Sequence, residues 1–166
     1  MMVLAIDPGN ELTGYCVLEA DTYRPLRFGK IPNEQMLDEL VDIMLSGVSE
    51  VVIERISSYG MAVGQTVFDT CWWSGRFFEA SLAYARKTSM LFRREVKLNL
   101  CCIASAKDAN VTQALIDRFD PYATNRGKGT KKNPGWFYGF KADIWQAYAV
   151  GVTYLDKERS KGVRHE

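Results

Sequence analysis

The sequence predicts an α/β protein in which helices cover the faces of one mixed sheet. Two observations support this fold class. Short apolar runs of strand length alternate with longer amphipathic segments, and the first three runs follow one another closely. Because no internal repeat or linker divides the chain, we expect a single domain over residues 1–166.

The first half of the chain is expected to open with an antiparallel meander of three strands. Pro8 and Gly9 form a turn between the first two strands, and a helix begins near Pro32. Ser46 and Gly47 end that helix, and an apolar run bounded by two glutamates follows it. The predicted strands cover residues 2–7, 13–18, 26–31 and 50–54, and the predicted helix covers residues 32–47.

The second half is predicted to contain three helices and one strand. The first helix has an apolar stripe with steps of three and four residues. An apolar run that includes Cys101 and Cys102 is typical of a strand, and Ser105 can cap the helix after it. The predictions are a helix over 65–86 with the stripe Phe68, Cys71, Gly75, Phe78, Leu82 and Ala85, a strand over 96–104, a helix over 105–118, a loop over 121–140 and a helix over 142–158.

Composition excludes several classes of function. No apolar run reaches the ~18 residues of a membrane span, and the N-terminus lacks a signal-peptide pattern, so we expect a cytoplasmic protein. The four cysteines lack Cys-x-x-Cys spacing and are expected to be buried thiols in a reducing compartment. The single histidine, His165, argues against a serine–histidine triad or a histidine-rich zinc site.

The charges are distributed unevenly along the chain. Residues 1–60 carry 10 acidic and 4 basic side chains, whereas residues 61–166 carry 10 acidic and 17 basic ones. This asymmetry suggests that one surface binds a polyanion, although a basic half can also be simply solvated.

Three carboxylates are placed where they could share a metal site. Asp7 and Glu54 each close a predicted strand, and the carboxyl ends of parallel strands meet at one edge of a sheet. Asp143 lies in the first turn of the last predicted helix. Taken separately, Glu54 is typical of a strand-end surface acid and Asp143 of an acid favoured by the helix dipole. Together they form a set of oxygen ligands that suits a hard divalent cation.

Three motifs resemble those of RuvC Holliday-junction resolvases. Residues 5–15 read AIDPGNELTGY and resemble the family's opening motif, in which an acid-Pro-Gly turn precedes Thr-Gly-Tyr. Residues 51–54 (VVIE) resemble its second acidic strand, and residues 142–147 (ADIWQA) resemble its C-terminal acidic helix. The motifs occur in the family's order and span nearly the whole chain, whereas the middle of the chain diverges, as in a phage or mobile-element member.

The resemblance implies an RNase H-like fold and a homodimeric endonuclease that nicks four-way DNA junctions. It also implies two Mg²⁺ ions per active site, for which Mn²⁺ can substitute, held by Asp7, Glu54 and Asp143. At the position where the family has a further acid, this chain has Gln146, which can offer a metal only a carbonyl oxygen. Lys107 matches a lysine of some resolvases and is expected to meet a phosphate near the metal site, although it could equally be a solvated lysine.

A basic segment near the end of the chain is predicted to bind DNA. It contains no acid and is followed by aromatic residues that could stack on exposed bases or pack in the core. Two further aromatics, Tyr59 and Phe68, lie where a side chain could wedge into a junction, although Phe68 and Trp72 could also pack in the core or a dimer interface. The basic residues are Arg126, Lys128, Lys131, Lys132 and Lys141, and the aromatics after them are Trp136, Phe137, Tyr138 and Phe140.

Two other functions remain open from the sequence. The first is a junction-binding protein that does not cleave, which Gln146 makes plausible. The second is a phosphotransferase of the sugar- or acetate-kinase type, although such enzymes usually need two domains of this kind. A P-loop is absent, because Tyr122 stands where the first glycine of that motif would precede Gly127 and Lys128.

Overall fold

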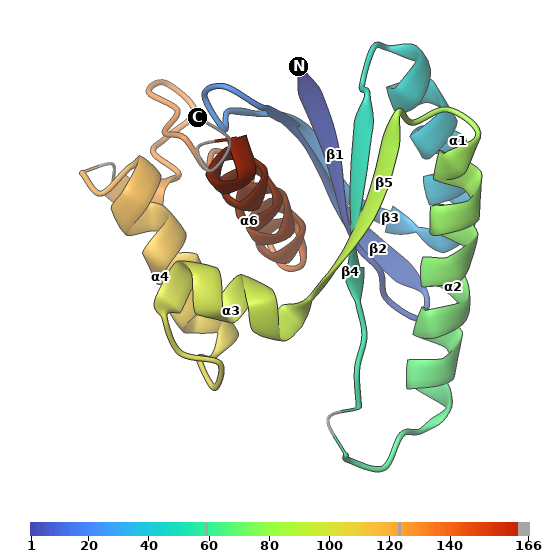
Figure 1. Ribbon diagram of the computed structural model, residues 1–166. Coiled ribbons are helices and arrows are strands. Elements are labelled where there is room, and N and C mark those ends of the chain that lie inside the picture. Colours follow the sequence, from blue (N-terminus) through green and yellow to red (C-terminus); the bar gives the residue numbers. More distant parts are fainter. Residues whose placement is uncertain (59, 123, 163–166) are drawn as a thin grey trace.

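The computed structural model describes residues 1–58, 60–122 and 124–162. A five-stranded sheet in the order β3-β2-β1-β4-β5 forms its centre (Figure 1). The first three strands form the expected antiparallel meander, and β4 and β5 continue the sheet parallel to β1. The strands are β1 (Met2–Asp7), β2 (Leu12–Glu19), β3 (Pro25–Pro32), β4 (Glu50–Arg55) and β5 (Lys87–Phe92).

Helices cover both faces of this sheet, which confirms the predicted fold class. Figure 1 shows α1 and α2 on one face, and α3, α4 and α6 on the other. In the part of the chain that the structure describes, no helix has the length and apolar character needed to cross a membrane. The helices are α1 (Asn33–Leu45), α2 (Gln65–Leu82), α3 (Arg93–Cys101), α4 (Asp108–Phe119), the short α5 (Thr124–Gly127) and α6 (Ile144–Gly162).

The strands alternate their side chains between two hydrophobic cores. In β1, Val3 and Ala5 join the core beneath α6, whereas Leu4 and Ile6 join the core beneath α1 and α2. This alternation is the two-residue period of a strand that is buried on both faces. It also places Asp7, the last residue of β1, on the same face as Val3 and Ala5.

The strand predicted over residues 96–104 is wrong, because this segment forms most of α3. Val96 and Leu100 are four residues apart and contact the α6 core together, whereas Leu98 between them is exposed. Alternating apolar residues therefore mark a helix face here, not a strand. The true strand is the preceding β5, an edge strand of half-buried residues.

Helix α2 ends at Leu82, four residues earlier than expected, and only Phe78 and Ala85 of the predicted apolar stripe pack against the core. Thr70, Trp73 and Phe77 form its buried face, whereas Phe68 and Leu82 of the predicted stripe are exposed. The expected burial of all four cysteines is also wrong. All four are free thiols, of which Cys16 is buried, Cys101 is half-buried, and Cys71 and Cys102 are exposed.

Candidate active site

Asp7 and Glu54 lie side by side at the carboxyl ends of two parallel strands. Ile6 of β1 pairs with Ile53 of β4, so that the two acids follow in register. Both share the face of Ala5 and of Val52, which is the face covered by α6. Glu54 is only 6% exposed, so it is not the solvent-exposed strand-end acid that its sequence position alone would suggest.

Asp143 approaches the same face because Gly14 leaves room for it. Gly14 pairs with Asp7 across β1 and β2. A Cβ atom at Gly14 would lie 2.7 Å from the backbone oxygen of Asp143 and 2.9 Å from its Cβ. The glycine of the Thr-Gly-Tyr motif is therefore required by close packing of the segment that carries the third acid.

Asp143 was expected in the first turn of the last helix, but it lies immediately before α6 (Ile144–Gly162). Its carbonyl oxygen accepts the backbone N–H of Ala147 at 2.9 Å, so it begins the helical hydrogen-bond pattern. The residue before it, Ala142, has a positive φ of 44°. Such strain in a residue with a Cβ is often found at functional sites.

The turn after Asp7 is held by Asn33, the first residue of α1. Its side-chain amide donates to the carbonyl oxygen of Gly9 at 2.9 Å, and its side-chain oxygen accepts from the hydroxyl of Thr13 at 2.6 Å. Asn33 is 2% exposed, so these bonds are sheltered from water. The start of α1 therefore fixes the loop next to the first acid.

The carboxylates perturb one another strongly. Burial raises the pKa of Asp7, and the neighbouring Glu54 raises it further, as do Asp143 and Asp108 to a smaller extent. Arg93 acts in the opposite direction on Asp7. Burial also raises the pKa of Glu54, and the charge of Arg93 opposes this effect. The site therefore concentrates negative charge where little water is available to screen it.

Sequence reasoning missed two basic residues that pair with these acids. Arg93 follows β5 and lies 2.8 Å from Glu54, and Lys30 of β3 lies 2.6 Å from Asp143. Lys30 pairs in register with Gly14, so the correct strand pairing could have revealed it. The position of Arg93 depends on β5, a half-buried strand without a continuous apolar run in the sequence.

The acids suit a divalent cation chemically. All three are carboxylates, the ligands that hard cations prefer, and the ion pairs found among the described residues leave Asp7 without a cationic partner. As they stand, no three histidine, cysteine, aspartate or glutamate side chains in the described ranges are grouped to hold a metal. Basic side chains hold two of the acids, so a cation would have to compete with Arg93 and Lys30.

Gln146 lines a cavity of about 270 Å³ beside this site, between the first turns of α4 and α6. Arg126, Lys128 and Asp108 line the same cavity. Gln146 is half-buried, and its role as a metal ligand stays a prediction. Lys107 is exposed and directly precedes α4 instead of lying in its first turn. Its neighbour Asp108, unlike Lys107, is among the residues whose charge acts on Asp7.

The basic segment presents its charges to solvent, whereas two of the four aromatics that follow them are buried. The positions of Phe137 and Phe140, 0% and 1% exposed, contradict a role in base stacking. Trp136 stacks on Phe119 with 5.4 Å between ring centroids, and Tyr138 is exposed. The exposed or half-buried basic residues are Arg126, Lys128, Lys131, Lys132 and Lys141.

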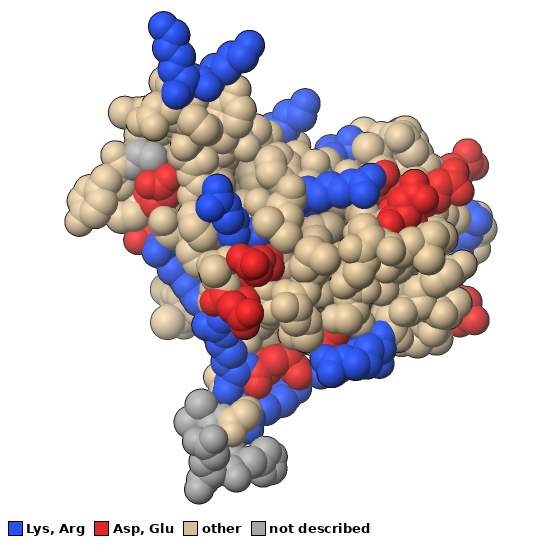
Figure 2. Space-filling model, turned by 90° about the horizontal axis from the view of Figure 1, so that it is seen from above, with Lys and Arg blue, Asp and Glu red and all other residues tan. Residues whose placement is uncertain are grey.

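The end of the molecule at which β1 begins differs from the basic segment in its surface charge. Figure 2, which looks down on that end, shows acidic and basic side chains interspersed over its surface. This end therefore offers no uniformly basic surface to a polyanion.

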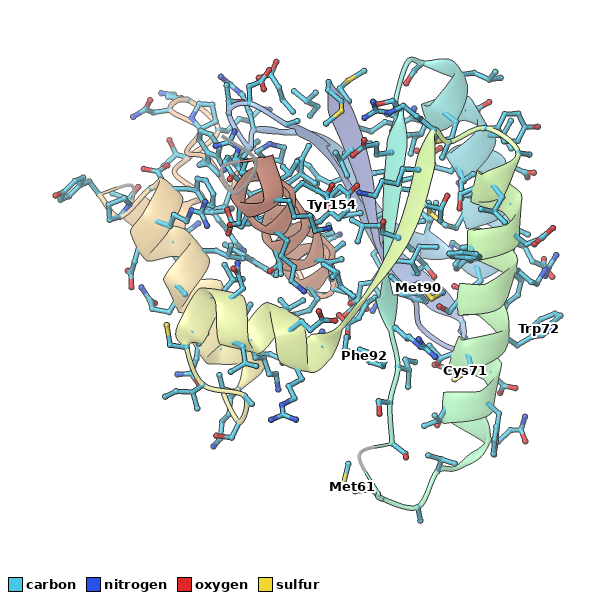
Figure 3. The ribbon with its side chains drawn as sticks, in the orientation of Figure 1. Met61, Cys71, Trp72, Met90, Phe92 and Tyr154 are labelled. Atoms are coloured by element: carbon cyan, nitrogen blue, oxygen red, sulfur yellow. The ribbon has the colours of Figure 1, made fainter. Side chains whose placement is uncertain are left out.

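The proposed wedge residues belong to the connection between β4 and α2 and to the first turn of α2. Tyr59 lies outside the described residues. Phe68 is exposed near the start of α2, and Trp72 points away from the sheet (Figure 3). The guanidinium of Arg76 lies 4.9 Å from the ring centroid of Trp72. Phe68 and Trp72 are 57% and 60% exposed, so neither is a core residue.

Comparison with solved structures identifies the fold. The chain matches a structure of Thermus thermophilus RuvC with a TM-score of 0.69 and 16% sequence identity, over 97% of each chain. It also matches T. thermophilus RuvC in complex with a Holliday-junction substrate, with a TM-score of 0.71 and 16% identity over 96% of each chain. By sequence, no family model and no curated protein matches.

These likenesses establish the fold of the chain as that of RuvC, an RNase H-like fold. The resemblance that the sequence motifs indicated is thus confirmed at the level of the fold.

Proposed function

We propose that this protein is a metal-dependent endonuclease that cuts branched DNA, in the manner of a Holliday-junction resolvase. One observation supports the proposal: Asp7 and Glu54 end neighbouring parallel strands on the α6 face of a RuvC-like sheet, and Asp143 packs against Gly14, the strand partner of Asp7. A similar fold has been solved as T. thermophilus RuvC with a Holliday-junction substrate, which supports branched DNA as the substrate class.

The three carboxylates would hold Mg²⁺, or Mn²⁺ in its place, and Gln146 would offer a neutral oxygen nearby. Bound divalent cations supply the charge that activates a water and stabilises the leaving oxygen of a phosphodiester. Asp7 and Glu54 are fixed by strand register, Asn33 holds the turn beside Asp7, and Gly14 lets Asp143 approach. The protein thus orients its acids before DNA binds.

The basic segment would hold the DNA backbone next to these acids. Arg126 and Lys128 line the cavity that contains Asp108, which lies close enough to Asp7 to affect its pKa. Lys131 and Lys132 lie further along the same segment and are exposed. Contacts from such side chains neutralise phosphates without reading sequence.

A cleavage assay tests this function. Wild-type protein is incubated with a labelled four-way junction and with linear duplex of the same sequence, with and without Mg²⁺. We expect paired nicks in the junction only when the metal is present. Asp7→Asn and Asp143→Asn should each keep DNA binding and leave less than about one per cent of cleavage, a barrier increase above about 2.7 kcal/mol. Metal-independent cutting, or none under any condition, would contradict the proposal.

We propose further that two copies pair through the outer face of α2. A four-way junction has approximate two-fold symmetry, and paired nicks need two active sites, which an isologous dimer supplies. The face carries exposed apolar side chains together with the charged residues Arg76 and Glu79, and it lacks a partner within the described residues, as expected for a protein–protein contact. Its exposed residues, with those of the loop before α2, are Met61, Val63, Phe68, Trp72 and Leu82.

Gly75 provides a test of this interface. It is exposed in the middle of α2, and no atom lies within 4 Å of where its Cβ would be. Gly75→Arg should therefore leave the protomer folded and disrupt a second helix packed against it. Light scattering should show a dimer for the wild type and a monomer for the variant at micromolar concentration. A wild type that is monomeric both free and on DNA would contradict the dimer.

A junction-binding protein that does not cleave is the second candidate. It is favoured by the ion pairs that hold Glu54 and Asp143, together with Gln146 in place of an acid. The same assay separates the two functions, because this candidate requires tight junction binding with no cleavage at any metal concentration.

A further inference from the structure

Arg93 links two acids that come from different parts of the fold. One terminal nitrogen of its guanidinium lies 2.8 Å from the carboxylate of Glu54, at the end of β4. The other lies 2.7 Å from the carboxylate of Asp108, the first residue of α4. A planar guanidinium can make both contacts at once, which a lysine ammonium on a flexible stem does less well.

The surroundings of this bridge distinguish it from an ordinary structural ion pair. Glu54 is buried beside Asp7, and the charge of Arg93 also acts on Asp7. Four carboxylates therefore share this corner of the sheet with the two basic side chains that form ion pairs with them, and the charge of Lys97 also acts on Glu54. Without a cation, the four acids and their two ion-paired bases would carry a formal net charge of −2, which one divalent ion would neutralise. The acids are Asp7, Glu54, Asp108 and Asp143, and the bases are Lys30 and Arg93.

We propose that Arg93 is a positioning residue that supplies, within the protein, the positive charge of a second divalent ion. The DNA-free protein then binds one divalent ion per active site, and further positive charge is accommodated only once a DNA phosphate is present. Asp108 holds the guanidinium against Glu54, so this pair of residues also fixes the side chain of Glu54. The inference rests on the proposed function and refines the number of ions that the resemblance to RuvC implies.

Titration calorimetry with Mn²⁺ on the DNA-free protein tests the proposal directly. We expect one ion per protomer for the wild type. Arg93→Gln should either bind a second ion or bind the first at least about tenfold more tightly, because it removes a like charge next to the site. Arg86→Gln is the matched control, since Arg86 pairs with buried Glu50 at the opposite end of the same two strands. It should leave the stoichiometry and affinity unchanged.

Thermal melting gives a second readout that does not depend on activity. Arg93→Gln leaves Glu54 buried without its partner, so its metal-free melting temperature should fall. Mn²⁺ should restore it, and should raise it more than it raises that of the wild type. Arg86→Gln should also melt lower, but without this additional recovery. Arg93→Lys, which keeps the charge, should retain wild-type metal stoichiometry.

The outcomes separate this inference from the proposed function. A wild type that binds Mn²⁺ with a stoichiometry and affinity unaltered by Arg93→Gln would overturn the role of Arg93 and leave the nuclease proposal intact. Two ions per protomer in the DNA-free wild type would also overturn it. No Mn²⁺ binding to the wild type, with or without junction DNA, would instead refute the metal-dependent function.

Discussion

The two ends of β4 carry the same kind of ion pair in different surroundings. Glu50 begins the strand and pairs with Arg86, just before β5, whereas Glu54 lies near its end and pairs with Arg93, just after β5. Both glutamates are buried, 4% and 6% exposed. At the first end, Tyr154 donates a hydrogen bond to the second oxygen of Glu50 at 2.8 Å. That carboxylate is therefore fully held by partners of its own.

At the Glu54 end of β4, the neighbours are acids and not a neutral hydrogen-bond donor such as Tyr154. Asp7 lies next to Glu54 in register, and Asp108 lies on the far side of Arg93. A buried ion pair by itself is weak evidence for function, because it can be a purely structural contact. The two ends therefore differ in the neighbours of the ion pair: a surplus of acidic side chains surrounds Glu54, at the end of β4 where we propose that a metal binds.

The largest contrast is expected between the two glutamates themselves. Glu54→Gln should reduce junction cleavage at least about 100-fold, or about 2.7 kcal/mol, because it removes a metal-binding charge. Glu50→Gln should keep cleavage within about threefold and lower the melting temperature instead. Single-turnover cleavage and thermal melting of both variants decide this. If the two variants lose cleavage to the same extent, the ends of the strand do not differ as proposed.

The next contrast concerns DNA binding by two sets of lysines, one in the basic segment and one already paired with acids. Replacing Lys128, Lys131 and Lys132 with Gln should weaken binding to junction and linear DNA alike, and reduce the salt slope by up to about three, because each lysine would otherwise release a counterion on meeting a phosphate. A charge-matched control replaces three lysines that already pair with acids. These are Lys87, Lys157 and Lys161.

Binding isotherms at several salt concentrations measure both variants. The control should shift the slope far less. Equal slopes for the wild type and the Lys128 variant would show that the basic segment does not meet DNA.

The sequence was sufficient to place Asp7 and Glu54 because both depend on a local pattern. Each acid ends a continuous apolar run, and such runs next to one another in a parallel sheet bring their ends together. The opening motif pointed to Gly14, but the reason for a glycine there, the close approach of Asp143, needed the structure.

Arg93 and Asp108 were beyond sequence reasoning because their positions depend on β5. That strand is half-buried and lies at the sheet edge, so it lacks the apolar signature of β1 and β4. The helix after it has alternating apolar residues that favoured a strand over residues 96–104. Tertiary packing decided between the two, since Val96 and Leu100 contact the core from one helix face.

A smaller effect is expected on stability at the acidic end. Burial and neighbouring acids raise the folded-state pKa of Asp7 above the unfolded value of about 3.9. The folded protein therefore binds this proton more tightly than the unfolded chain does. The contribution of this proton to the free energy of unfolding is fully present below the unfolded pKa. It is lost as the pH rises through the folded pKa. Asp7→Asn removes this cost.

In metal-free buffer at neutral pH, Asp7→Asn should therefore melt about 2–4 °C higher than the wild type, or about 1 kcal/mol. The difference should vanish below about pH 3, where Asp7 is protonated in both states. Asp42→Asn, at an exposed acid of α1, should change the melting temperature at neither pH. A pH-independent difference would mean that amide packing, and not charge, is responsible.

The smallest effect is expected at Gln146, whose side chain could serve either the metal or the DNA. It is three residues after Asp143 and shares its side of the chain, but it also lines the cavity with Arg126 and Lys128. An acid at this position would add a metal-binding charge. It would also compete with a DNA phosphate for Arg126. The structure excludes the alternative that Gln146 is part of the hydrophobic core, because the residue is half-buried at a cavity wall.

We therefore expect Gln146→Asp to lower the metal concentration for half-maximal cleavage by roughly threefold and to weaken junction binding by a similar factor, about 0.7 kcal/mol each. Gln146→Ala serves as the control, because it removes the amide without adding charge, and should shift the metal requirement less than any change at Asp143. The metal titration is run at saturating junction, and binding is measured in Ca²⁺ so that cleavage does not interfere. Weaker DNA binding with an unchanged metal requirement would assign Gln146 to the cavity alone. The proposed metal site would then consist of Asp7, Glu54 and Asp143, without an oxygen ligand from Gln146 of α6.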